Sequence, residues 1–220
     1  MFARPVATLD LLRDRPRWLA PLLLASAYVT AVNCYAVTRF GLERVAAAVV
    51  RANSSVDPRL LTETILAHRN RILWMHAASA FAGSILAALF AALFLWLLVL
   101  AAGGETRFKC VLSVVVHVGL LVAVAEYTMV AVVVTLDGSP NTLSLRNLLA
   151  TNPAFYLQPK SGAVLRLLSS LDIISFARLI LLAAGLSKVS AGVSRLAAFM
   201  LVSIPWCIYV AAGTLIPWLP

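Results

Sequence analysis

The chain has 220 residues, of which 62% are hydrophobic and only 12% are charged. A soluble domain is about half apolar and about a quarter charged, so this composition excludes an ordinary soluble domain. The net charge is +9, but the basic residues stand mostly at the ends of long apolar blocks and form no basic stripe, which argues against nucleic acid as a partner.

A basic leader, residues 1–18, opens the chain and contains four arginines: Arg4, Arg13, Arg15 and Arg17. The apolar block at residues 19–38 follows, and it is about long enough to cross a hydrocarbon core of about 30 Å. A basic stretch before an apolar one is also typical of a signal peptide, but no clear small-residue cleavage motif follows. We therefore interpret the block as an uncleaved first membrane span.

The first loop, residues 39–71, mixes charged and apolar residues. Asp57 and Pro58 form a helix-start signal, because Asp caps helix N-termini and proline is favoured at the first helical position. The helix that begins there carries Leu60 and Leu61 on one side. We expect a short interfacial helix that leads into the second span.

The second span, residues 72–101, has small residues at every fourth position in two parallel rows. The first row is Ser79, Gly83, Ala87 and Ala91, and the second row is Ala80, Ser84, Ala88 and Ala92. Such rows let helix backbones approach closely in lipid. We therefore predict that this is the central packing helix of the bundle and that the first row is a helix-packing surface.

Three further apolar blocks predict spans at residues 111–136, 172–187 and 196–219, of which the fourth span is short for a full crossing. In the third loop, residues 141–171, leucines beside Arg146 predict a second short interfacial helix. The expected fold is an all-α integral membrane protein: a five-transmembrane-helix bundle with short interfacial helices in the first and third loops.

Two ionisable residues fall inside predicted spans, Glu126 in the third and Arg178 in the fourth. A charge at that depth costs roughly 2.5–3.5 kcal/mol on insertion scales, so such residues face the bundle or a cavity and pair with one another. We predict that the two residues interact, with Asp172 as a competitor for Arg178. The pair is interpreted as structural, and an ion or proton pathway is the alternative.

The other polar candidates are His117 in the third span and Asn33 in the first. Isolated histidines without a ligand motif make a poor zinc site, so no metal is predicted. We expect Asn33 to form an interhelical hydrogen bond. The sequence contains no phosphate loop, G-x-S-x-G elbow or H-E-x-x-H motif, so no catalytic residue, cofactor or enzyme activity is predicted.

Three segments carry a resemblance to a known family. They are Arg4-Pro5 with Arg15-Pro16-Arg17-Trp18-Leu19-Ala20-Pro21-Leu22, Phe108-Lys109 with Val111-Leu112, and Leu168-Ser169-Ser170-Leu171-Asp172 leading into Leu181-Leu182-Ala183-Ala184-Gly185-Leu186. In these segments the chain resembles the bacterial branch of the Yip family, the Ypt/Rab-interacting proteins. The resemblance implies a membrane domain over residues 19–220 with five spans, a cytoplasmic N-terminus and an exoplasmic C-terminus.

Two functions follow as expectations. The first is a non-enzymatic membrane scaffold or accessory subunit in the bacterial cytoplasmic (inner) membrane, in contact with lipid and with another membrane protein. A homo-oligomer is a further possibility that the sequence does not decide. The resemblance implies that this partner is a MacB-like ABC exporter. The alternative is a small transporter or channel that uses Glu126 and Arg178.

Overall fold

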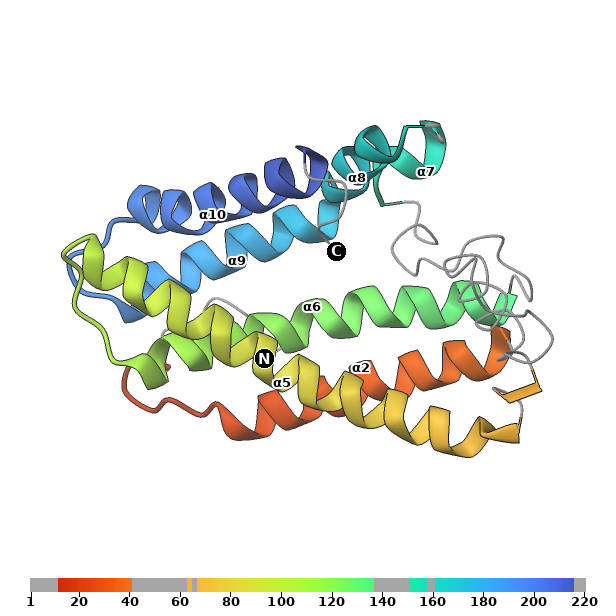
Figure 1. Ribbon diagram of the computed structural model, residues 1–220. Coiled ribbons are helices and arrows are strands. Elements are labelled where there is room, and N and C mark those ends of the chain that lie inside the picture. The colour runs from red at the N-terminus through yellow and green to blue at the C-terminus, as the bar shows by residue number, and fades with distance from the viewer. Residues whose placement is uncertain (1–11, 41–62, 65–66, 137–150, 158–160, 216–220) are drawn as a thin grey trace.

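The computed structural model describes residues 12–40, 63–64, 67–136, 151–157 and 161–215, which are largely helical (Figure 1). The helices are α2 (Leu19–Phe40), α5 (Arg69–Ala101), α6 (Phe108–Leu136), α7 (Pro153–Leu157), α8 (Gly162–Ser170), α9 (Ile173–Val189) and α10 (Arg195–Leu215). The first eleven residues of the leader and the interfacial helices expected around residues 57–62 and 143–149 lie outside the described residues, as does the end of the fifth predicted span.

Four of these helices, α2, α5, α6 and α10, are long and apolar enough to cross a membrane, and the bent pair α8–α9 is a further candidate. With its 17 residues, α9 is about 25 Å long, which is less than the thickness of a hydrocarbon core. The helix α8 precedes α9 in the chain, and the two helices are bent by 48° relative to each other. The all-helical fold with several membrane-length helices is therefore confirmed, and the helices begin and end close to the predicted limits.

The centre of the bundle is α6, which packs against α2, α5 and α9. Its apolar stretch is 61% buried, against 28% for α2, 17% for α5 and 11% for α10. The prediction that residues 72–101 form the central helix is therefore wrong. The run from Val111 to Val118 is buried on every side, because valine and other short side chains let neighbouring helices approach α6 from several directions.

Two tyrosines of α2 hydrogen-bond to two threonines of α6. Tyr28 Oη lies 2.7 Å from Thr128 Oγ1, and Tyr35 Oη lies 2.9 Å from Thr135 Oγ1. Each threonine hydroxyl donates to a carbonyl of its own helix, so the tyrosine is the donor in both pairs. The seven-residue spacing on both helices places the two bonds on one seam, and it shows that α2 and α6 run parallel.

The turn between α5 and α6 is joined to the turn between α9 and α10 at one end of the bundle, on the left in Figure 1. Glu105 and Ala191 exchange both backbone N–H···O bonds, at 3.0 and 2.9 Å. The hydroxyl of Thr106 adds a third bond between the two turns, because it donates to the carbonyl of Val189, and the carbonyl of Thr106 accepts from Trp96 Nε1 of α5. We call this set of contacts the turn joint.

Glycine makes the turn joint possible. A Cβ on Gly104 would clash with Val193 Cγ2, so any other residue there would have to displace the Val193 side chain. Gly103 and Gly192 have φ of 75° and 78°, a left-handed conformation that L side chains rarely adopt. The Gly103-Gly104 pair therefore allows both a tight turn and close contact with the neighbouring turn.

The turn joint predicts that an engineered disulfide can form across it. A hydrogen-bonded antiparallel pair has a Cα separation of about 5.5 Å, within the range that a disulfide spans. In a chain whose three native cysteines are replaced by alanine, Glu105→Cys with Ala191→Cys should crosslink on mild oxidation, as read by mobility on non-reducing gels. Glu105→Cys with Ser169→Cys, which lies beyond the far end of α9, is the control and should stay reduced. Equal crosslinking of both pairs would contradict the fold.

Candidate functional site

The site is centred on Glu126 of α6 and Arg178 of α9, which the structure brings together. Arg178 Nη2 lies 3.4 Å from Glu126 Oε2. The side chains are 45% exposed for Arg178 and 23% exposed for Glu126. The two residues stand 52 positions apart in the sequence and meet because α9 packs along α6.

Asp172 does not compete for Arg178, because its carboxylate caps the N-terminus of α9. Oδ1 accepts from the backbone N–H of Ile174 at 2.8 Å, and Oδ2 accepts from the backbone and the hydroxyl of Ser175. Asp is a preferred capping residue and also a favourable charge at a helix N-terminus. The cap fixes where α9 begins, and this places Arg178 on its second turn beside Glu126.

The ion pair leaves much of its hydrogen-bonding capacity unused. A guanidinium has five N–H donors, and within the described part of the chain Arg178 uses one of them, in the contact to Glu126. At 3.4 Å, this contact is longer than the 2.7–2.9 Å of a typical charge-assisted bond. The pair therefore offers several donors and few acceptors to any molecule that reaches it.

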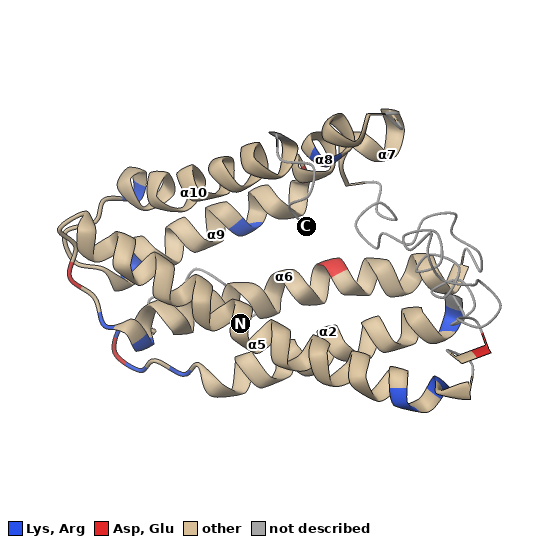
Figure 2. Cartoon of the chain, viewed as in Figure 1, with Lys and Arg blue, Asp and Glu red and all other residues tan. Residues whose placement is uncertain are grey.

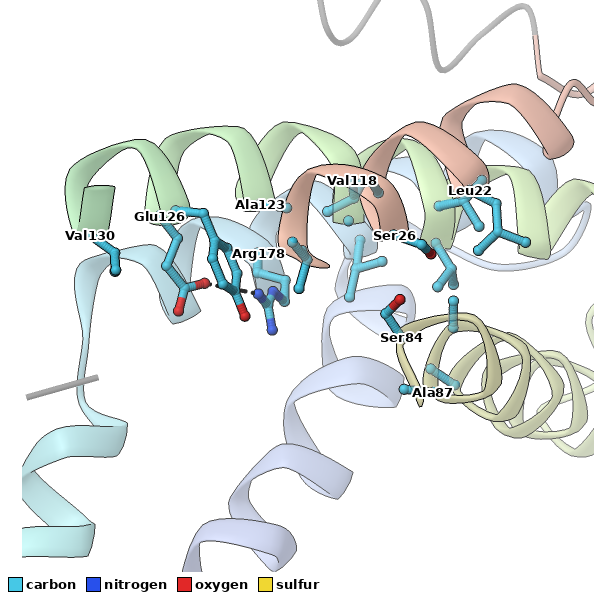
Figure 3. Close-up of a pocket in the computed structure, with 18 residues that line it drawn as sticks. Leu22, Ser26, Ser84, Ala87, Val118, Ala123, Glu126, Val130 and Arg178 are labelled. Atoms are coloured by element: carbon cyan, nitrogen blue, oxygen red, sulfur yellow. Dashed lines mark hydrogen bonds and ion pairs between the residues drawn. The ribbon is translucent and has the colours of Figure 1, made fainter. Parts of the chain in front are cut away.

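A cavity of about 480 Å³ adjoins the pair, with walls from α2, α5, α6 and α9 (Figure 3). Most of the lining side chains are apolar and small. Ser26 of α2 and Ser84 of α5 also line it, and Figure 3 shows them in its other part, away from Glu126 and Arg178. The arrangement combines an apolar space with two opposite charges on one side, which suits the binding of a molecule more than catalysis.

The two small-residue rows of α5 have different surroundings. The second row faces the bundle and includes Ala92, which is fully buried. The first row is exposed: Ala87 and Ala91 border the cavity, whereas Ser79 and Gly83 lie on the outer surface. A Cβ on Gly83 would meet no atom within 4 Å. Within the described chain, packing in the bundle therefore relies on the second row, and the predicted packing surface stays uncovered.

The two secondary polar candidates, His117 and Asn33, contact backbone carbonyls of their own helices. His117 is buried, and its Nδ1 lies 2.7 Å from the carbonyl of Ser113. Asn33 donates from Nδ2 to the carbonyl of Val29 at 2.9 Å, so the predicted interhelical hydrogen bond is wrong; the carbonyl one turn back is the nearer acceptor. Among the described residues, no cluster of three or more metal-ligating side chains occurs.

Comparison of the chain with models of protein families, with characterised proteins and with solved structures finds no match. The Yip resemblance therefore stays an expectation from the sequence, and the site is interpreted from its geometry.

A double-mutant cycle tests the ion pair. Glu126→Gln and Arg178→Leu should each lower the thermal stability of the detergent-solubilised protein, because each leaves a partly buried charge without its partner. An unpaired buried group costs about 1–3 kcal/mol, and the double variant should recover part of that loss. Glu105→Gln combined with Arg178→Leu is the control and should give additive losses. Additive losses for Glu126 and Arg178 as well would mean that the contact contributes nothing.

Proposed function

We propose that this chain is a five-span integral membrane protein that works without catalysis, as a scaffold or accessory subunit in lateral contact with another membrane protein. The proposal counts α8–α9 as one bent span, because α9 alone is too short to cross a hydrocarbon core. The resemblance to the Yip family adds the bacterial inner membrane as the location and a MacB-like ABC exporter as the class of partner.

The observation that carries the proposal is the uncovered surface at Ser79 and Gly83. Small residues on a membrane helix let another helix approach closely, and here the bundle does not fill the space above Gly83. Leu86, a large exposed side chain, lies about one turn from Gly83 on the same helix. A partner helix that lies on this surface would contact the α5 backbone near Gly83 and the side chain of Leu86.

The direction of the helices supports one orientation in the membrane. Because α2 and α6 run parallel, both begin at the end of the bundle that holds the turn joint, and α10 also begins there and ends at the opposite end (Figure 1). Four basic residues lie in or next to the short turns of the joint: Arg107, Lys109, Lys188 and Arg195. The leader that precedes α2 is also rich in arginine (Figure 2). The opposite end of the bundle also carries basic residues, Arg39, Arg69 and Arg71, so the number of basic residues alone does not decide the orientation. The first helix usually sets the orientation and its leader is basic, so we propose that the turn joint is cytoplasmic and the C-terminus is outside.

Reporter fusions test this orientation. Alkaline phosphatase attached after Pro220 should be active, because it folds only outside the cytoplasm, and green fluorescent protein at the same position should be dark. Truncated fusions after Lys188, in the turn joint, are the control and should show the reverse. A fluorescent fusion at Pro220 would contradict the proposed orientation.

Gly83→Leu tests the contact surface. The leucine side chain would project into the space that a partner helix needs, so the variant should lose most of the membrane protein that co-purifies from native membranes in mild detergent. The bundle should stay folded, because the new Cβ meets no atom within 4 Å and leucine favours a helix over glycine. Mass spectrometry of the co-purified material identifies the partner.

Gly119→Leu is the matched control. Gly119 is also a helical glycine whose Cβ would meet no atom within 4 Å, but it lines the cavity and not the outer surface. It should retain the partner. Equal recovery of partner with Gly83→Leu and with the unchanged protein would contradict the proposed surface. Recovery of this chain alone would contradict an accessory subunit and would indicate a homo-oligomer.

A small transporter is the second candidate, because the ion pair borders a cavity inside the bundle. Charged residues at this depth mark ion or substrate pathways in many transporters. Ion flux in proteoliposomes that Glu126→Gln abolishes would favour this function over the scaffold.

A further inference from the structure

We propose that the cavity between α2, α5, α6 and α9 binds a single-chain fatty acid, with the carboxylate on Arg178 and the acyl chain along the small-residue walls of α5 and α6. This site is separate from the outer surface at Gly83 and goes beyond both candidate functions. Three features of the cavity carry the proposal: its size, its charge and the origin of its space.

The size suits one acyl chain. Small-molecule sites are mostly apolar cavities of about 300–1,000 Å³ with a few polar groups, and this cavity measures about 480 Å³. At about 30 Å³ for each water-sized group, it holds about 16 heavy atoms. A fatty acid of medium length has this size, whereas a two-chain phospholipid is several times larger.

The remaining hydrogen-bond donors of Arg178 suit an acid. The guanidinium of Arg178 is half exposed, and Glu126 occupies one of its five donors through Nη2. A carboxylate matches the planar fork of a guanidinium with two parallel hydrogen bonds, which a neutral headgroup cannot form. An uncharged occupant would leave those donors without partners in an apolar setting, and this is unfavourable.

The space for the acyl chain comes from the small residues that line the cavity. Ala87 and Ala91 of α5 and Gly119 of α6 all line the cavity, and a Cβ on Gly119 would meet no atom within 4 Å. Figure 3 shows Ala87 and Arg178 in different parts of the same cavity, so a chain anchored at Arg178 has an apolar path toward α5. An acyl chain gains roughly 0.8 kcal/mol for each methylene that it buries there.

The experiment measures binding of radiolabelled myristate to the purified full-length protein in a non-ionic detergent, by equilibrium dialysis. Myristate should bind saturably with one site per chain. 1-Tetradecanol has the same chain without the acid, and acetate has the acid without the chain, so both should compete weakly. Equal competition by 1-tetradecanol would overturn the role of Arg178, and equal competition by acetate or preferential binding of a phospholipid would overturn the fatty-acid site.

Three variants locate the site. Gly119→Leu should abolish myristate binding, because its side chain would occupy cavity space from a position where the new Cβ meets no atom within 4 Å. Arg178→Gln should weaken binding roughly tenfold to a hundredfold, as expected for the loss of hydrogen bonds to a charged group. Gly83→Leu, outside the cavity, should bind as the unchanged protein does. Unchanged affinity in Gly119→Leu, with the protein still folded by circular dichroism, would sink the proposal.

Discussion

The turn joint is the constraint on which the rest of the bundle depends. Two backbone hydrogen bonds between Glu105 and Ala191 and the two bonds of Thr106 hold four helix ends together. The close approach of Gly104 to Val193 leaves no room for a side chain between the turns. With one end fixed, α5 and α9 diverge along α6, and the cavity lies in the part of the bundle where they no longer meet (Figure 1).

The placement of charge follows from the same geometry. In hydrocarbon, a polar group without a partner is unfavourable, and a single contact at 3.4 Å satisfies little of a guanidinium. Glu126 therefore occupies only one of the guanidinium donors, and the fatty acid that we propose would supply further acceptors. On the outside of α5, in contrast, Gly83 offers close approach without charge. The two surfaces differ in chemistry, and this is why we assign a lipid acid to one and a partner helix to the other.

The sequence was sufficient for the features that composition and local pattern determine. Long apolar blocks located the membrane-length helices, and the cost of a charge in lipid was enough to pair Glu126 with Arg178. It was insufficient where the outcome depends on contacts across the fold. Two equivalent rows on α5 did not reveal which one faces the bundle, and the Tyr–Thr bonds join residues 100 positions apart without any local signal.

The role of Asp172 was missed for a similar reason. It was expected to compete for Arg178, but in the structure it caps the start of α9. The central role of α6 was also hidden, because its valine-rich sequence is as suitable for facing lipid as for packing against three helices. In a membrane chain both surfaces are apolar, so the hydrophobic pattern does not distinguish the inside of the bundle from the outside.

The most direct test of this account is a pair of distances between spin labels in nanodiscs, measured by double electron–electron resonance. Labels at Glu105 and Ala191 report on the turn joint, and labels at Ala87 and Ala177 report on α5 and α9 beside the cavity. The account predicts a short, narrow distribution at the joint and a clearly longer one beside the cavity. Equally short distances for both pairs would show that α5 and α9 close against each other, and they would contradict the cavity and the site built on it.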